Sequence, residues 1–576
     1  MIMALQWSTQ LLQAVPAIAA LQWSPCTSGP ALDCTTLTVP LEYADPDNGH
    51  LAHIPLARFN ATVPASQRKG HLLTNPGGPG SSGIDFLVNG AGEAISNITG
   101  GFYDIASWDP RGVGSARPLL QCFNSTGEEI EAADSVAGAA NIEYSQLTNQ
   151  SYMPEFYSGI QDYDAQVAPL ANACAQHNST ALYTSSAAYV ARDMAAIADA
   201  LEGKDNATLN YWGFSYGTIF GAEFIQTFPE RVGRIVFDGV FDPEANAKTY
   251  ASQLPNDELF VRDAIDDLVE FCTDAGPDGC ALSRPQGALN STLDIRKRLA
   301  TLQASLYESP VLVPDGSFSI DVSTFSFFMY SFIKLPTTWP AVASAVSALE
   351  TGDAGPLADL LTDGMGSGSV TNYSAPDTGS LAGWPLQCID NAPTNHMTVP
   401  ELAKLVLNIS LAEKTPWLNA DLATLSFCRN FPNKRARVSN LGAGMLKSGR
   451  TDRILSARDT PVLIVNALHD PSTPVTSAQR LNGWLGSSSR LVMRRGPGHT
   501  SMSLASLGLV SAIRDYLLDG ELPVTDVHDV SQLVFDREID QDTMTPDPVF
   551  NGTYTDEETM LLQSTYEIFL AFLSLP

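Results

Sequence analysis

Apolar and polar positions along the first half of the chain predict strands that alternate with helices. Strand-like patterns run over 36–43 and 52–59, the second with apolar side chains on every other position. Shorter and more apolar runs follow, each leading into Gly, Pro, Asn or Asp, at 71–74, 102–108, 209–212 and 234–237. Because such runs suit strands buried on both faces, the pattern predicts an α/β fold with a mainly parallel sheet flanked by helices.

After Pro243 the pattern becomes helical. Apolar residues keep the spacing of one helix face at Ile295, Leu299, Leu302 and Leu306, and 401–413 is similar. Strand signals return at 462–465 and 490–493. The simplest organisation is a sheet interrupted by a helical cap, in the order 1–20 (candidate signal peptide), 21–242 (first part of the core), 243–440 (inserted helical cap), 441–525 (second part of the core) and 526–576 (carboxyl-terminal extension).

One pentapeptide has the form G-x-S-x-G, with Ser215 at its centre. It follows the apolar run 209–212 and precedes a helix-forming segment, 218–228, which is the strand-turn-helix setting of a nucleophile elbow. Such a turn crowds the residues beside the serine, and Gly213 and Gly217 relieve that crowding. Ser215 is therefore the candidate nucleophile, and the alternative is a glycine-lined tight turn.

A serine hydroxyl needs a base and an orienting acid, which follow such a serine in the order Asp, His. Asp470 lies beyond the strand predicted at 462–465, and His499 lies in a glycine-lined loop beyond the next strand. Asp459 precedes the first of these strands and falls at the wrong edge of the sheet. The neighbouring His469 precedes the second strand, and we expect it to be a surface or capping histidine.

The loop 75–80 supplies glycines that let backbone N–H groups face the site. We expect the amides of Gly78 and Tyr216 to form an oxyanion hole. Gly78, Gly80 and Gly83 also satisfy G-x-G-x-x-G, the fingerprint of dinucleotide binding. Pro79 within that run and the triad residues elsewhere argue against nucleotide binding. No C-x-x-C pair occurs, which disfavours zinc ribbons and thioredoxin-type redox motifs. We expect neither a cofactor nor a metal.

The chain is strongly acidic, with 63 Asp and Glu against 32 Lys and Arg and a formal net charge of −31. This charge repels phosphate backbones, so nucleic acid is not an expected partner. No apolar run reaches the roughly 18 residues that a membrane span needs. With 44% hydrophobic residues the chain has ample material for a globular core.

Glycosylation sequons and cysteines indicate the secretory route. About four N-x-[ST] triplets are expected by chance, and the chain has ten, at Asn60, Asn97, Asn124, Asn149, Asn178, Asn206, Asn290, Asn372, Asn408 and Asn551. In an oxidising compartment Cys26 with Cys34, and Cys272 with Cys280, would each close a short loop; free thiols are the alternative. The run 11–20 is a weak candidate signal peptide, because Gln13 and Pro16 interrupt it and no Lys or Arg precedes it.

Taken together, the motifs resemble the tripeptidyl and prolyl aminopeptidase-like branch of the α/β-hydrolases from about residue 23 to about residue 520. The matching segments are Gly77–Gly80, Trp108–Ser115, Gly213–Thr218, His469–Pro474 and Gly496–His499, in that order. The resemblance implies a triad of Ser215, Asp470 and His499 and a cap over the cleft. A departure is Phe431, where the family pattern leads us to expect Trp.

The resemblance also implies roles for residues of the cap and of the first loops. Paired cysteine segments imply a bridge between Cys388 and Cys428. Cap carboxylates of related prolyl enzymes bind the free amino terminus of the substrate, and Asp390 is a candidate here, with a structural role as the alternative. For Asp109 and Arg111 we expect a salt bridge that braces their turn.

The expected function is that of a secreted serine exopeptidase that hydrolyses peptide bonds near a free amino terminus through an acyl-enzyme. The same triad can hydrolyse esters or lactones of small metabolites, so the substrate is a peptide or a small acyl compound. A hydrolase-like binding protein without activity is a third reading. The number of residues released in each cut and the oligomeric state do not follow from the sequence.

Overall fold

A ten-stranded sheet forms the centre of the computed structural model, which describes residues 21–29, 31–137, 142–143, 146–177, 179–252, 254–283, 292–363, 383–394, 396–413, 419–432, 449–535 and 548–575. In spatial order, the first four strands pair antiparallel, and all the pairings after them are parallel. In spatial order the strands are β1 (Ser24–Pro25), β2 (Asp33–Pro40), β3 (Leu51–Phe59), β5 (Asp104–Trp108), β4 (His71–Asn75), β6 (Leu209–Phe214), β7 (Val232–Asp238), β10 (Val462–His469), β11 (Ser489–Pro497) and β12 (Val527–His528).

Two layers of helices cover the central strands, which explains their continuous apolar sequences. On one face pack α6 (Ala187–Glu202), α7 (Gly217–Thr227) and α19 (Val475–Leu485). On the other face pack α2 (Gly92–Ile98), α20 (Leu507–Asp519) and α21 (Asp556–Leu573). Neighbouring residues of β4 illustrate the division, since Leu73 belongs to the first core and Leu72 to the second. The mainly parallel α/β sheet predicted from the sequence is confirmed.

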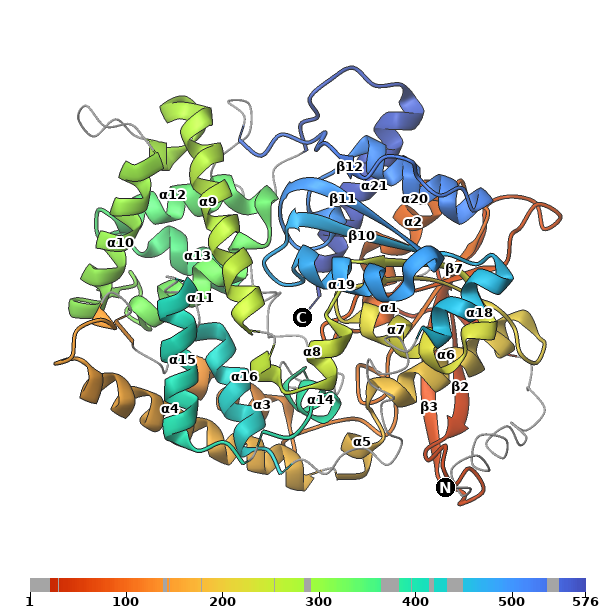
Figure 1. Ribbon diagram of the computed structural model, residues 1–576, viewed down its shortest axis with the longest axis horizontal. Coiled ribbons are helices and arrows are strands. Elements are labelled where there is room, and N and C mark those ends of the chain that lie inside the picture. The colour runs from red at the N-terminus through yellow and green to blue at the C-terminus, as the bar shows by residue number, and fades with distance from the viewer. Residues whose placement is uncertain are drawn as a thin grey trace.

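A group of helices lies to one side of the sheet, where Figure 1 shows them in green and teal. Most come from the chain between β7 and β10: α9 (Leu254–Gly279), α10 (Thr292–Glu308), α11 (Val322–Ile333), α12 (Trp339–Leu349), α13 (Gly355–Asp363), α14 (Gly383–Asp390), α15 (Val399–Glu413) and α16 (Asn419–Asn430). A short hairpin, β8 (Val311–Leu312) with β9 (Ser319–Ile320), lies among them and was not predicted.

The helical group also takes in a segment that precedes residue 242. The helix α4 (Met153–His177) follows β5 in the chain, yet it packs against α15 and α16. An ion pair between Asp164 of α4 and Arg429 of α16 joins the two segments. The helical layer thus draws on two parts of the chain, and the expected boundary at residue 242 separates helices that share one core.

Four disulfide bonds are present: Cys26–Cys34, Cys122–Cys174, Cys272–Cys280 and Cys388–Cys428. Three of these pairings were expected from close spacing or from the family resemblance. The pairing of Cys122 with Cys174 was not, because 52 residues separate the two and only the packing of α4 brings them together.

The salt bridge expected between Asp109 and Arg111 is not the one that forms. Arg111 pairs instead with Asp193 of α6, at 2.7 Å from Nε to Oδ2, and its guanidinium lies against the rings of Tyr43 and Tyr189. Asp109 accepts hydrogen bonds from Ser82 and from backbone N–H groups, and burial raises its pKa to about 6. The two side chains therefore stabilise the turn separately.

The sequons differ in how far they reach the surface. Asn97 is partly buried in α2, while six others have exposed side chains: Asn60, Asn124, Asn149, Asn206, Asn408 and Asn551. Asn178, Asn290 and Asn372 lie outside the described residues. Among the helices that the structure describes, we find none with the length and apolar character needed to cross a membrane.

Candidate active site

Ser215 lies in the sharp turn between β6 and α7. Its backbone is in the left-handed region, with φ at 51°, which is an uncommon conformation for any residue with a side chain. A Cβ on Gly213 would lie 2.4 Å from the ring of Tyr211, and one on Gly217 would lie 2.7 Å from the carbonyl oxygen of Asn75. The turn therefore requires glycine on both sides of the serine, as the sequence pattern indicated.

Asp470 and His499 meet at the carboxyl ends of β10 and β11. His499 Nδ1 lies 3.0 Å from Oδ1 and 3.1 Å from Oδ2 of Asp470. The carboxylate is fully buried and also accepts hydrogen bonds from the backbone N–H of Ser472, Thr473 and Thr500 and from the hydroxyl of Thr473. Burial raises the pKa of Asp470, but His499 and these hydrogen bonds outweigh it and hold the pKa below its usual value. The acid thus stays ionised beside the imidazole.

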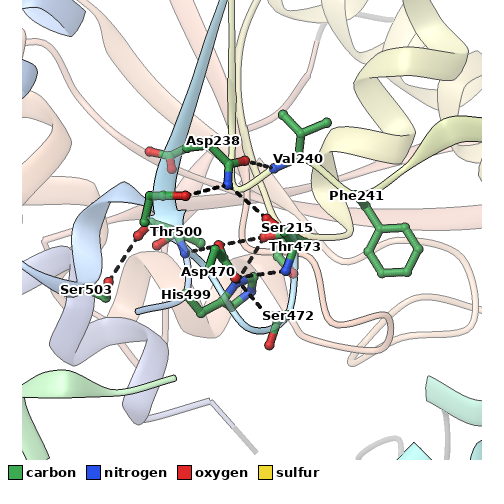
Figure 2. A network of polar contacts seen from close by, with 12 residues as sticks. Ser215, Asp238, Val240, Phe241, Asp470, Ser472, Thr473, His499, Thr500 and Ser503 are labelled. Atoms are coloured by element: carbon green, nitrogen blue, oxygen red, sulfur yellow. Dashed lines mark hydrogen bonds and ion pairs between the residues drawn. The ribbon is translucent and has the colours of Figure 1, made fainter. Parts of the chain in front are cut away.

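Asp238, at the end of β7, connects Ser215 to the histidine loop (Figure 2). Its carbonyl oxygen accepts a hydrogen bond from the N–H of Ser215 at 3.0 Å. Its carboxylate accepts two from Ser501, at 2.7 Å from the N–H and 2.6 Å from the hydroxyl. Among the described residues the Ser215 hydroxyl makes no hydrogen bond to His499, and such bonds are often long before substrate binds.

Asp238 was missed by the sequence analysis, although one signal was available. It is the acidic residue at the carboxyl end of a predicted strand, directly before Gly239, which is also the position of a ligand-facing residue in an open α/β sheet. Burial raises its pKa to about 6, against the hydrogen bonds from Ser501 that lower it.

Arg494 is a second residue that the sequence analysis did not identify. Its side chain is fully buried in β11, and the guanidinium donates to the carbonyl oxygens of Pro497, Thr500 and Ser501. These three carbonyls flank His499 on both sides. Burial lowers the pKa of Arg494 to about 10, so the group remains a cation that holds the histidine loop in place.

The inserted helices contact the histidine loop directly. The N–H of His499 donates to the carbonyl oxygen of Lys334, at the end of α11, at 2.8 Å. A Cβ on Gly498 would lie 2.7 Å from the ring of Pro336, so only glycine permits this approach. His469, beside the acid, contacts Asp267 of α9 at 2.6 Å. The insertion therefore packs on the loops that carry the acid and the histidine.

The glycine-rich loop after β4 lies against the turn that carries Ser215. Gly77 has φ at 102°, and a Cβ on it would lie 2.6 Å from the amide nitrogen of Tyr216. Gly78 follows with φ at 106°. Because this contact brings the loop of Gly78 beside the amide of Tyr216, the two expected oxyanion donors are close in space.

Asp390, the candidate for binding a substrate amine, is buried at the end of α14. Its carboxylate accepts a hydrogen bond from the hydroxyl of Tyr216 at 2.5 Å and from the N–H of Ala187 at 2.9 Å. Burial and the charge of Asp390 raise the pKa of Tyr216 well above its usual value, so the phenol remains a donor. These contacts favour the structural role that the sequence left open.

Two regions of the chain match known families. Residues 70–264 match the family described as alpha/beta hydrolase fold, and residues 443–529 match the one described as TAP-like protein. The first region contains Ser215, and the second contains Asp470 and His499. With the sheet order, these matches show that the chain is an α/β hydrolase of the serine hydrolase class.

Among curated relatives, a tripeptidyl aminopeptidase from Streptomyces lividans is 27% identical over 530 residues, which cover 89% of this chain and 87% of that protein. The serine protease Hip1 of Mycobacterium tuberculosis (strain ATCC 25618 / H37Rv) is 26% identical over 516 residues, covering 87% of this chain and 89% of Hip1. Carboxylesterase B of the same strain is 28% identical over 504 residues, covering 85% of each chain. The resemblance inferred from the motifs is confirmed.

Proposed function

We propose that the chain is a secreted serine exopeptidase that cleaves peptides near a free amino terminus. The observation that carries this proposal is the arrangement at the sheet edge, where the Asp470–His499 pair and the strained turn of Ser215 are joined through Asp238. The similarity to a tripeptidyl aminopeptidase and to a serine protease over most of the chain supports a peptide as substrate.

In the proposed mechanism the Ser215 hydroxyl attacks the scissile carbonyl while His499 takes its proton. Asp470 holds the imidazole through Nδ1 and stabilises the imidazolium that forms. The amides of Gly78 and Tyr216 stabilise the negative oxygen of the tetrahedral intermediate. His499 then gives the proton to the leaving amine, and water releases the acyl group from Ser215 by the same route.

A substrate series tests the proposal. Tripeptidyl and aminoacyl amides with a free amine are compared with their N-acetylated forms and with short acyl esters, and the products are read by mass spectrometry. We expect cleavage of the free-amine peptides, weaker cleavage after N-acetylation, and labelling of Ser215 by a fluorophosphonate probe. Full turnover by Ser215→Ala would overturn the proposal.

Hydrolysis of small esters is a second candidate, favoured by the similarity to carboxylesterase B. An enzyme with this activity would turn over the short esters and leave all the peptide amides intact. Failure of the probe to label Ser215, with no turnover of either substrate class, would instead indicate a binding protein.

Secretion is part of the proposal. Four disulfide bonds and six exposed sequon asparagines support passage through an oxidising compartment that adds N-glycans. Expression in a eukaryotic secretory host tests this point. We expect protein in the medium whose mass falls after treatment with an N-glycosidase, and intracellular unglycosylated protein would contradict it.

A further inference from the structure

The short helix α14 contacts both the glycine-rich loop and the side chain of Tyr216. At its first residue, a Cβ on Gly383 would lie 2.7 Å from the carbonyl oxygen of Pro79, in the glycine-rich loop. At its last residue, Asp390 binds the hydroxyl of Tyr216, which directly follows Ser215. One helix of the insertion therefore rests on both elements that surround the reacting carbonyl in the proposed mechanism.

Gln387 lies between these two anchor points on the same face of α14. Residues at i, i+4 and i+7 share a helix face, and Gly383, Gln387 and Asp390 have this spacing. Cys388 and Ile389 lie on the opposite side and belong to the apolar core of the inserted helices. The face that carries Gln387 is thus the face turned to the loop of Pro79 and to Tyr216.

The side-chain nitrogen of Gln387 is buried and has no partner among the described residues. The residue is 5% exposed, and its Nε2 has no hydrogen-bond partner within the part of the chain that the structure describes. Leaving such a donor unpaired destabilises the folded protein. A buried polar group of this kind, on a helix face turned to the loop of Pro79 and to Tyr216, is suited to a bond that forms when the substrate is present.

We propose that Gln387 is a substrate-binding residue, which donates a hydrogen bond from Nε2 to a backbone carbonyl of the bound peptide. The inference rests on the proposed peptidase function and gives that function a recognition element. A tripeptidyl group carries carbonyls besides the one that reacts, whereas an acetyl group has only the reacting carbonyl. Gln387 therefore favours peptidyl over simple acyl substrates.

The test compares Gln387→Met with the matched variant Gln303→Met. Gln303 of α10 is also buried with an unpartnered Nε2 among the described residues, but its neighbours Leu302 and Leu306 pack in the apolar core of α10, α11 and α12 and not against α14. Methionine has a similar volume and no donor. Each variant and the wild type are assayed with a tripeptidyl 4-nitroanilide and with 4-nitrophenyl acetate. The melting temperature of each protein is also measured.

For Gln387→Met we expect kcat/KM on the tripeptidyl substrate to fall roughly 3- to 10-fold, mostly through KM, with acetate hydrolysis unchanged. Its melting temperature should equal or exceed that of the wild type, since the change removes an unpaired buried donor. For Gln303→Met we expect both activities to stay unchanged. A structural role for Gln387 would instead lower the melting temperature and both activities together.

The outcomes separate the two levels of the proposal. If Gln387→Met cleaves the peptide as fast as the wild type does, the role of Gln387 alone is overturned. The same holds if the variant loses equal activity on the peptide and on the acetate. A wild type that hydrolyses acetate but no peptide would overturn the peptidase function and, with it, the binding of a peptide carbonyl by Gln387.

Discussion

The hydroxyl of Tyr216 donates a hydrogen bond to the carboxylate of Asp390 at 2.5 Å, although 174 residues separate the two in the chain. The bond connects the residue after Ser215 to helix α14 of the insertion. The Tyr216 ring is buried between Phe220 and Phe241, so its backbone has little freedom once the hydroxyl is held. The insertion therefore helps to fix the position of the Tyr216 amide, which is expected to stabilise the oxyanion.

Loss of this bond should lower turnover more than it lowers substrate binding. For Tyr216→Phe and Asp390→Asn we expect kcat to fall about tenfold. Complete removal of an oxyanion donor lowers kcat by more than this, and these variants only make the position of the Tyr216 amide less fixed. Since both act on one bond, the double variant should be little worse than either single variant. Steady-state kinetics with a peptide substrate measure this effect.

The matched control is Tyr516→Phe. Tyr516 is also a fully buried tyrosine, whose hydroxyl donates to the carbonyl oxygen of Pro461 far from Ser215 in the chain. We expect this variant to lose stability and to keep its kcat. Equal losses of kcat in Tyr216→Phe and Tyr516→Phe would contradict a specific effect on the oxyanion site.

Asp238 should make stability fall as the pH rises from about 4 to about 6. Burial raises its pKa from 3.8 to about 6, so the folded chain binds this proton more tightly than the unfolded chain does. The contribution is complete below pH 4 and is lost as the group ionises, which amounts to about 3 kcal/mol. Asp238→Asn should remove this part of the pH dependence.

Thermal midpoints of the wild type and Asp238→Asn between pH 4 and pH 7 check the prediction. Asp109, whose pKa is also about 6, contributes a similar slope in both proteins and cancels in the difference. A difference between the two midpoints that does not change with pH would argue against Asp238 as the titrating group.

The contact of His469 with Asp267 should stabilise the docking of α9 at acid pH. The hydrogen bond to Asp267 raises the pKa of His469, with smaller contributions in the same direction from Asp263 and Glu270. The stabilisation is therefore present below about pH 6.5 and is lost as the pH rises through the raised pKa. Asp267→Asn should lower the thermal midpoint more at pH 5.5 than at pH 8.5, and the reverse order would refute this assignment.

The Cys388–Cys428 bond should matter for activity as well as for stability. It ties α14, which carries Gln387 and Asp390, to α16, and it closes a segment of 40 residues. Replacing both cysteines with serine should cost about 2–5 kcal/mol and lower kcat/KM on peptides. The matched pair Cys26→Ser with Cys34→Ser opens an 8-residue segment at the sheet edge and should leave kcat/KM unchanged. Loss of peptide turnover in both double variants would contradict a local effect on α14.

The sequence by itself determined the features that depend on short spacings. The strands β4, β6, β7, β10 and β11 could be predicted from apolar runs, because a strand buried on both faces needs consecutive apolar residues. The turn of Ser215 could be predicted because a sharp turn between strand and helix crowds the residues beside the serine, and Gly213 and Gly217 stand there. The order in which Ser215, Asp470 and His499 follow successive strands pointed to one sheet edge, since parallel strands end on the same side.

Only the tertiary structure decided which distant residues meet. Asp238 binds Ser501 across 263 positions, α4 joins the inserted helices, and Arg111 pairs with Asp193 of α6 and not with Asp109. Asp390 has the same carboxylate whether it faces a substrate or Tyr216, and no local spacing distinguishes the two. The partner of a buried polar group is set by how helices and strands pack, and that packing is a property of the whole chain.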